Sequence, residues 1–106
     1  MKKIFLEIRY SSGKDAKAYI LDISLGGMGI ACSKKINRKT MVEILPKKNV
    51  LCSLRGKVVS VLNMPRKSYK YRLGVKFLFL KTGELKKITG FINKIVKRKV
   101  ARLTFI

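Results

Sequence analysis

The sequence predicts a mainly β fold, a six-stranded antiparallel β-barrel followed by one C-terminal α-helix, on the basis of three observations. The 106 residues suffice for one domain with one modest core. From residue 5 to about residue 80, hydrophobic residues recur at every second position, in short runs that end in turn-forming residues. From Thr82 onward they recur at helical spacing. We therefore expect a single domain over residues 1–106, with the barrel at about 4–80 and the helix at about 82–98.

The strands follow from this alternation, beginning with Phe5–Tyr10, in which Leu6, Ile8 and Tyr10 lie on one face. Turn residues separate five further strands, which we place at residues 17–22, 28–32, 41–45, 50–61 and 69–80. Gly56 lies inside the fifth strand and predicts a bulge or a bend there. Short strands at this spacing are typical of a small antiparallel barrel. Its predicted core consists of Leu6, Ile8, Ile20, Ile23, Ile30, Val42, Ile44, Val58, Val75 and Phe77.

The helix is predicted from Thr82, a suitable N-cap, to about Arg98. Its apolar positions are Leu85, Ile88, Phe91, Ile92, Ile95 and Val96. We expect the first two turns to pack on the barrel through Leu85, Ile88 and either Phe91 or Ile92. The last turns are rich in Lys and Arg, whose mutual repulsion opposes close packing. We therefore expect the tail from Arg98 onward to be loosely held until a polyanion neutralises its charge.

Basic residues dominate the charge balance, because 26 Lys and Arg face only five acids and give a formal net charge of +21. Such a surface attracts the phosphates of nucleic acids, lipid headgroups or small ligands, although a lysine-rich composition serves solubility equally well. Cations and tyrosines alternate between Arg66 and Arg72. This alternation suits a strip on which single-stranded nucleic acid stacks, or simply a strand with one buried and one solvated face.

Several function classes are disfavoured by composition. The chain has no histidine, which argues against a histidine-based catalytic triad and a zinc–histidine site, and five acids argue against a two-carboxylate hydrolase. We expect a protein that is not an enzyme and holds no metal or cofactor. No apolar run approaches the roughly 18 residues of a membrane span. Cys32 and Cys52 lie in apolar segments, and we interpret them as core hydrophobes of a reduced, cytoplasmic protein.

The segment Leu21–Ile30 contains Asp22-x-Ser24-x-x-Gly27, with an additional glycine at Gly26. Adjacent glycines let a backbone approach a ligand closely, since no Cβ stands in the way. A carboxylate can accept hydrogen bonds from the N1–H and N2–H₂ edge of guanine, and a hydroxyl can donate to a phosphate or a base. The same residues equally well make an ordinary Gly-Gly turn whose Asp and Ser cap backbone amides.

The segment Asp22-Ile-Ser24-Leu-Gly26-Gly27-Met-Gly29 resembles the signature turn of PilZ domains, which are bacterial receptors for cyclic di-GMP. Phe5–Tyr10 is similar to their first strand, Leu73-Gly-Val-Lys-Phe77 to their late Gly-x-x-Phe strand, and the helix from Thr82 to their C-terminal helix. The resemblance implies a six-stranded barrel with a C-terminal helix. It also implies a ligand site, whose residues would be Asp22, Ser24, Gly26, Gly27 and Gly74.

The sequence departs from the family at its beginning. Members that bind the dinucleotide carry Arg-x-x-x-Arg before the first strand, where this chain offers only Lys2 and Lys3. Lysine cannot supply the planar, bidentate contacts of a guanidinium. Arginines with that spacing occur instead at Arg98 and Arg102, where they would bind phosphate or merely share a solvated face. The residues considered for phosphate contacts are Lys2, Lys3, Arg9, Arg98 and Arg102.

Three functions are therefore compared. The first is a receptor that binds cyclic di-GMP and relays its occupancy to a protein partner, such as a component of motility, pilus or exopolysaccharide machinery. The second is a PilZ-like adaptor that binds protein and no nucleotide, which the missing N-terminal arginines favour. The third, which we regard as less favoured, is a small basic barrel that binds RNA or single-stranded DNA.

Overall fold

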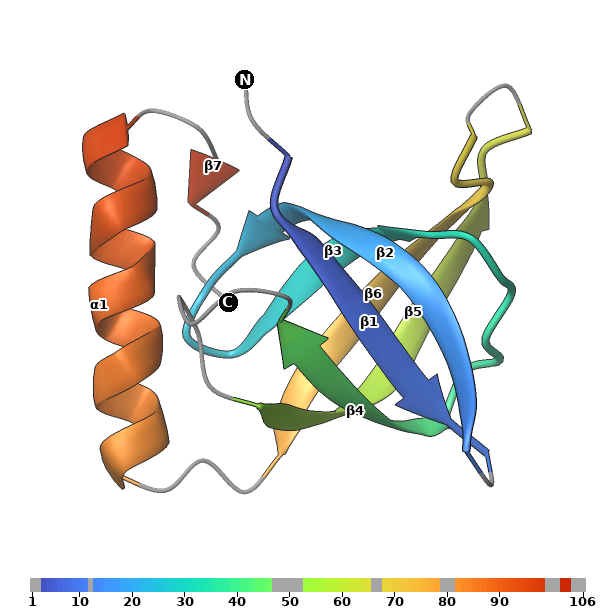
Figure 1. Cartoon of the computed structure of the whole chain (residues 1–106), viewed down its shortest axis with the longest axis horizontal. Coiled ribbons are helices and arrows are strands. Elements are labelled where there is room, and N and C mark those ends of the chain that lie inside the picture. The colour runs from blue at the N-terminus through green and yellow to red at the C-terminus, as the bar shows by residue number, and fades with distance from the viewer. Residues whose placement is uncertain are drawn as a thin grey trace.

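The computed structural model describes residues 3–11, 13–46, 53–65, 68–78, 82–98 and 102–103. Six strands alternate with short connections along the chain: β1 (Phe5–Tyr10), β2 (Lys14–Ile23), β3 (Gly27–Cys32), β4 (Met41–Pro46), β5 (Leu54–Asn63) and β6 (Tyr71–Leu78). They pair antiparallel in the order β1-β4-β5-β6-β3-β2, and β1 also pairs with β2. This last pairing closes the sheet into a barrel (Figure 1). The predicted fold class is confirmed.

The barrel interior is filled by the alternate side chains of all six strands. Nine of the ten residues predicted for the core are buried: Leu6, Ile8, Ile23, Ile30, Val42, Ile44, Val58, Val75 and Phe77. Ile20 is only partly buried. It directly precedes an irregularity in the β2–β3 register, between Ile20 and Asp22, where one extra residue interrupts the alternation. The period of two therefore predicted the core correctly, except beside this bulge.

Strand β5 corrects a second prediction. Its bulge lies between Val58 and Ser60, not at Gly56. Gly56 is buried, and a Cβ there would overlap the side chain of Val75 and approach the carbonyl oxygen of Lys76 to 3.0 Å. The glycine is therefore required by close packing of β5 on β6. Of the strand predicted at residues 50–61, residues 50–52 lie outside the described part of the chain.

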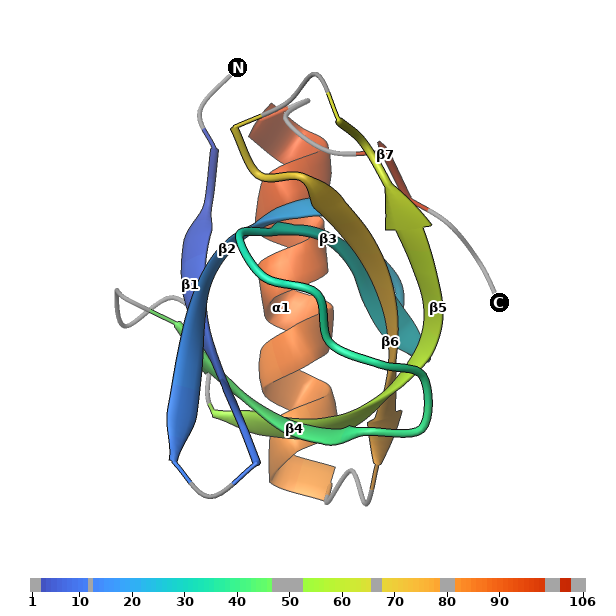
Figure 2. The ribbon, with the colours of Figure 1, turned by 90° about the vertical axis from the view of Figure 1, so that its right-hand side faces the viewer.

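Helix α1 (Thr82–Arg98) has the predicted bounds. It lies across one open end of the barrel, as the view along the barrel in Figure 2 shows. Ile88, Phe91 and Ile92 are buried and belong to the same hydrophobic cluster as the strand residues. Leu85 was expected to be buried but is 41% exposed. It lies about 60° around the helix axis from Ile88, so the barrel covers a narrower stripe than the apolar sequence pattern provides.

A seventh, two-residue strand follows the helix. Strand β7 (Arg102–Leu103) pairs in parallel with β2, with Arg102 opposite Asp22 and Leu103 opposite Ile23. The β1–β2 pairing ends at Tyr19, so the last residues of β2 leave an edge that β7 occupies. The expectation of a loose tail concerns residues of which 99–101 and 104–106 lie outside the description. Among the described residues, no helix is long and apolar enough to cross a membrane.

Candidate ligand-binding site

The β2–β3 turn is held by hydrogen bonds within itself and to β6. The Ser24 amide donates to the carbonyl oxygen of Gly27 at 2.8 Å, and the Ser24 hydroxyl accepts from the Gly26 amide at 3.3 Å. The Phe77 amide donates to the carbonyl oxygen of Gly26 at 2.9 Å. Ser24 is only 5% exposed. Its hydroxyl therefore organises the turn, and this serine is not among the residues that line the neighbouring cavity.

The Asp22 carboxylate is fixed by two donors from different strands. The Gly29 amide of β3 donates to Oδ1 at 3.0 Å, and the Arg72 guanidinium of β6 donates to Oδ2 at 2.9 Å. A side chain at Gly29 would interfere, since its Cβ would lie 2.8 Å from Oδ1 of Asp22. The carboxylate therefore lies over a bare stretch of β3, and a quarter of the Asp22 side chain remains exposed.

Three glycines on the outer face of the barrel form the floor of a cavity of about 880 Å³. Gly27 and Gly29 belong to β3, and Gly74 of β6 lies directly opposite Gly29. Around this floor stand one acid and two cations, Asp22, Arg72 and Lys76, and a wall formed by residues 59–62 of β5. Val59 and Leu62 of that wall are 44% and 61% exposed. The cavity therefore combines a floor of glycine backbone, an apolar wall and groups of both charges.

Sequence reasoning identified Asp22, Gly26, Gly27 and Gly74, all of which line this cavity, but it missed Arg72 and Lys76. The sequence nevertheless contains a pattern that could have identified both residues. In β6, the buried residues Leu73, Val75 and Phe77 alternate with residues 72, 74 and 76, so the latter share the outer face. What the alternation alone did not disclose is that this face adjoins Asp22, which lies 50 residues away in the chain.

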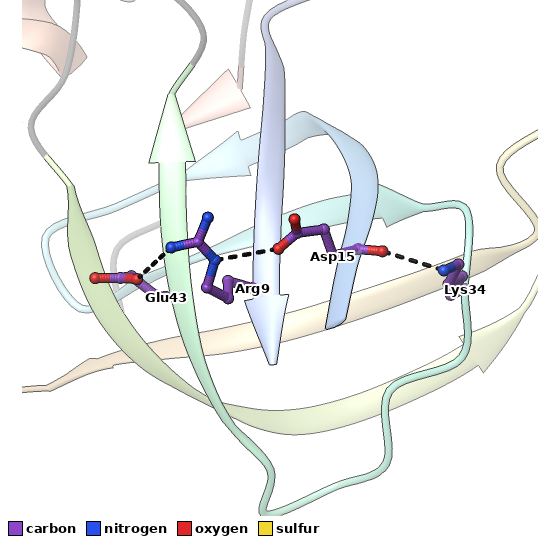
Figure 3. A network of polar contacts seen from close by, with 4 residues as sticks. All are labelled: Arg9, Asp15, Lys34 and Glu43. Atoms are coloured by element: carbon purple, nitrogen blue, oxygen red, sulfur yellow. Dashed lines mark hydrogen bonds and ion pairs between the residues drawn. The ribbon is translucent and has the colours of Figure 1, made fainter. Parts of the chain in front are cut away.

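Arg9 does not take part in the cavity. Its guanidinium lies between two carboxylates on the outside of β1 (Figure 3), with Nε 3.2 Å from Asp15 and Nη1 3.9 Å from Glu43. Lys34 joins this group by donating from Nζ to the backbone carbonyl of Asp15 at 3.2 Å. The charge of Arg9 is thus already compensated by neighbouring acids.

The other cations considered for phosphate contacts lie near the two ends of the chain. Lys3 places its ammonium 4.6 Å from the centroid of the Tyr19 ring on β2. Lys2 lies outside the described residues, and the side chain of Arg98, the last residue of α1, lies outside the description as well. Arg102 is brought into backbone register with Asp22 by β7. Among those of these cations that the structure describes, Arg102 is the one whose backbone pairs with a residue of the turn motif, Asp22.

Tyr69 and Tyr71, the two tyrosines between Arg66 and Arg72, have different neighbours in the structure. Tyr69 contacts Tyr19 and Phe5 with ring centroids 5.2 and 6.5 Å apart. Tyr71, at the start of β6, packs against the barrel core instead. The two rings therefore do not form one continuous stacking strip, because the chain bends before β6 begins.

Cys32 fits its interpretation as a small core hydrophobe. It is fully buried in the barrel cluster, and burial raises the pKa of its thiol, which disfavours the reactive thiolate. Cys52 lies outside the described residues.

Comparison with known proteins gave one family and several related structures. The family model for the PilZ domain matches residues 3–94. The fold is similar to that of the PilZ domain of YcgR from Escherichia coli with c-di-GMP, at a TM-score of 0.75 and 15% identity, over 92% of this chain and 84% of that one. It is also similar to MrkH from K. pneumonia in its apo state, at a TM-score of 0.73 and 15% identity, over 93% of this chain and 50% of that one.

A second structure of K. pneumonia MrkH gives a TM-score of 0.71 and 14% identity, over 93% of this chain and 47% of that one. The chain thus spans about half the length of MrkH. At these identities the likenesses show a shared fold. A comparison with the sequences of curated proteins gave no match.

Proposed function

Because the chain belongs to the PilZ domain family, we propose that it is a non-enzymatic receptor that binds cyclic di-GMP on the outer face of β3 and β6. The observation that carries the proposal is the Asp22 carboxylate held over a floor of glycines, with two cations beside it. Occupancy of this cavity is relayed to a protein partner, for which a component of motility, pilus or exopolysaccharide machinery is the expected class.

The chemistry of the cavity suits a guanine nucleotide. Guanine presents N1–H and N2–H₂ as adjacent donors, and a carboxylate accepts such a pair with its two oxygens. The base needs a close approach to the backbone, which Gly29 and Gly74 allow because they carry no side chain, and an apolar neighbour, which Leu62 provides. The Asp22 carboxylate lies against Gly29 and the Ser60 hydroxyl against Gly74, so both groups are within reach of a base there. The phosphates need cations, which Arg72 and Lys76 provide from β6. Adenine lacks the two adjacent donors, so an adenine dinucleotide is disfavoured.

In this proposal, further positive charge for the phosphates comes from residues near both ends of the sequence. Lys3 near β1 adds positive charge, and Arg102 adds an arginine from β7, next to Asp22 in register. Arg98 and Lys2 complete the set of cations at the two ends of the chain. Arg9 is left out, because Asp15 and Glu43 already compensate its charge.

Calorimetric titration with cyclic di-GMP, alongside cyclic di-AMP as the control ligand, tests the proposal directly. In Asp22→Ala, the guanine donors would lose their acceptor, and we expect a loss of roughly 1–3 kcal/mol of binding free energy, that is, about 5- to 150-fold in Kd. Asp15→Ala is the matched control, since Asp15 is an acid that does not line the cavity. Equal affinity of Asp22→Ala and the wild type would show that the turn is structural only.

The second candidate is an adaptor that binds protein and no nucleotide. The observation that favours it is that Lys2 and Lys3 stand before β1, where members that bind the dinucleotide carry an arginine, because lysine cannot supply bidentate contacts. If the chain is an adaptor of this kind, calorimetric titration with cyclic di-GMP should give no binding heat at any salt concentration. Binding to bulk single-stranded DNA or RNA that weakens steeply with salt would instead favour the nucleic-acid function.

A further inference from the structure

Arg72 occupies the point where the cavity and the Asp22 carboxylate meet. Its side chain is 47% exposed, and its Nη2 lies 2.9 Å from Oδ2 of Asp22. Two residues further along β6 on the same outer face is Gly74, which has no side chain of its own and is approached by the Ser60 hydroxyl of β5. Arg72 itself lines the cavity, so its guanidinium can leave Asp22 and still remain at the cavity.

The free Asp22 carboxylate has one oxygen committed to the fold and one committed to Arg72. Oδ1 accepts from the Gly29 amide, a contact that fixes the carboxylate on β3. Oδ2 accepts from Arg72. Because each carboxylate oxygen can accept more than one hydrogen bond, Oδ1 can accept from guanine in addition to the Gly29 amide. The second guanine donor is directed at Oδ2, so Arg72 has to give up or share that oxygen when the base arrives. An ion pair as exposed as this one contributes little stability, which makes the exchange easy.

A guanidinium that loses its carboxylate needs another anion. The phosphate of the same ligand is such an anion, and Arg pairs with phosphate through two parallel N–H···O bonds. Lys76, two residues beyond Gly74 on the same face, adds a point charge but not this geometry. A guanine without a phosphate would leave Arg72 without an anion, whereas a guanine nucleotide satisfies both members of the Asp22–Arg72 pair.

We propose that Arg72 is a ligand-binding residue that exchanges partners, from the Asp22 carboxylate in the free protein to a ligand phosphate in the complex. This inference rests on the proposed function, and it assigns to β6 a guanidinium contact with the ligand phosphate. The Asp22–Arg72 pair thereby recognises both parts of the ligand, Asp22 by binding the base and Arg72 by binding a phosphate.

The test is calorimetric titration of the full chain with cyclic di-GMP at several NaCl concentrations. We expect Arg72→Ala to weaken binding at least about tenfold and to lower the slope of log K against log salt, because one charge-assisted contact with a phosphate is lost. Arg72→Lys keeps the charge but not the fork, so it should retain the slope and recover part of the affinity. Arg55→Ala is the matched control, an exposed arginine on β5 that does not line the cavity.

The alternatives give different results. If Arg72 merely blocks Asp22, Arg72→Ala will bind more tightly than the wild type, and equal affinity will mean that Arg72 has no contact with the ligand. Either result overturns this inference and leaves the proposed function standing. A wild-type protein that binds no cyclic di-GMP overturns both. Thermal unfolding of each variant verifies that it is folded, and we expect Arg72→Ala to unfold close to the wild type because its ion pair is exposed.

Discussion

Gly27 and Gly29 lie two residues apart on β3, but glycine is required at the two positions for different reasons. A Cβ at Gly27 would overlap the backbone carbonyl oxygen of Val75, whose strand is fixed in the barrel. A Cβ at Gly29 would instead meet the carboxylate of Asp22, which is the end of a side chain and can turn away. Gly27 is thus required by the barrel and Gly29 by the position of Asp22.

This difference predicts opposite outcomes for two alanine variants. Gly27→Ala should lower the free energy of unfolding by about 1–3 kcal/mol, since backbone must shift to admit the methyl group. Gly29→Ala should change it by less than about 1 kcal/mol but weaken cyclic di-GMP binding about tenfold, because the carboxylate leaves its place. Urea unfolding and calorimetry measure the two effects, with Gly83→Ala, whose Cβ meets nothing within 4 Å, as control. A large stability loss in Gly29→Ala would contradict this assignment.

At the scale of elements, β7 connects the end of the chain to the turn motif. It adds to the one part of β2 that β1 does not cover, and the register brings Arg102 opposite Asp22. Parallel pairing over two residues supplies few hydrogen bonds, so this strand contributes little by itself to stability. Its effect is on position, because its register places the backbone of Arg102 opposite that of Asp22.

We therefore expect Arg102→Ala to weaken cyclic di-GMP binding severalfold, whereas the matched variant Lys57→Ala on β5, which does not line the cavity, should leave it unchanged. Hydrogen exchange of the Arg102 and Leu103 amides should slow on adding the dinucleotide, because the ligand neutralises the positive charge nearby. If hydrogen exchange does not change on adding the ligand, and if Arg102→Ala binds it with full affinity, the C-terminal arginines take no part in binding the dinucleotide.

The electrostatics of the whole molecule are dominated by its formal net charge of +21 on 106 residues. In the described part of the chain, ion pairs join Arg9 to Asp15 and Glu43 and Arg72 to Asp22. Five acids cannot compensate 26 Lys and Arg, so a large excess of positive charge remains on a small domain. Such self-repulsion destabilises the compact state, and salt screens it, because the Debye length falls from about 10 Å at 0.1 M to about 3 Å at 1 M.

Raising NaCl from about 0.05 to 0.5 M should therefore raise Tm by several degrees, since about 1 kcal/mol corresponds to roughly 4–8 °C in a domain of this size. Differential scanning calorimetry measures the shift, and sucrose at equal osmolality controls for effects unrelated to charge. A Tm that stays constant or falls with salt would mean that the surface charges are already balanced in the fold.

The sequence by itself determined the barrel, the bounds of the helix and the position of the turn motif. Each depends on local patterns: a period of two for the strands, a helical period after Thr82, and the Asp-Ser-Gly-Gly chemistry of residues 22–27. Because the strand period fixes which side chains face inward, the core followed as well. The core prediction was wrong at Ile20, beside a bulge in β2, and the bulge considered at Gly56 lies instead between Val58 and Ser60.

Only the tertiary structure decided which outer faces meet. Arg72 lies beside Asp22 because β3 pairs with both β2 and β6, and no local pattern encodes a pairing across 50 residues. The same holds for Arg102 on β7, for Tyr69 and Tyr71 on different surfaces, and for Leu85 at the margin of the helix contact. Closure of the barrel fixes all these registers together, and it thereby turns an ordinary-looking strand of alternating residues into one side of a charged cavity.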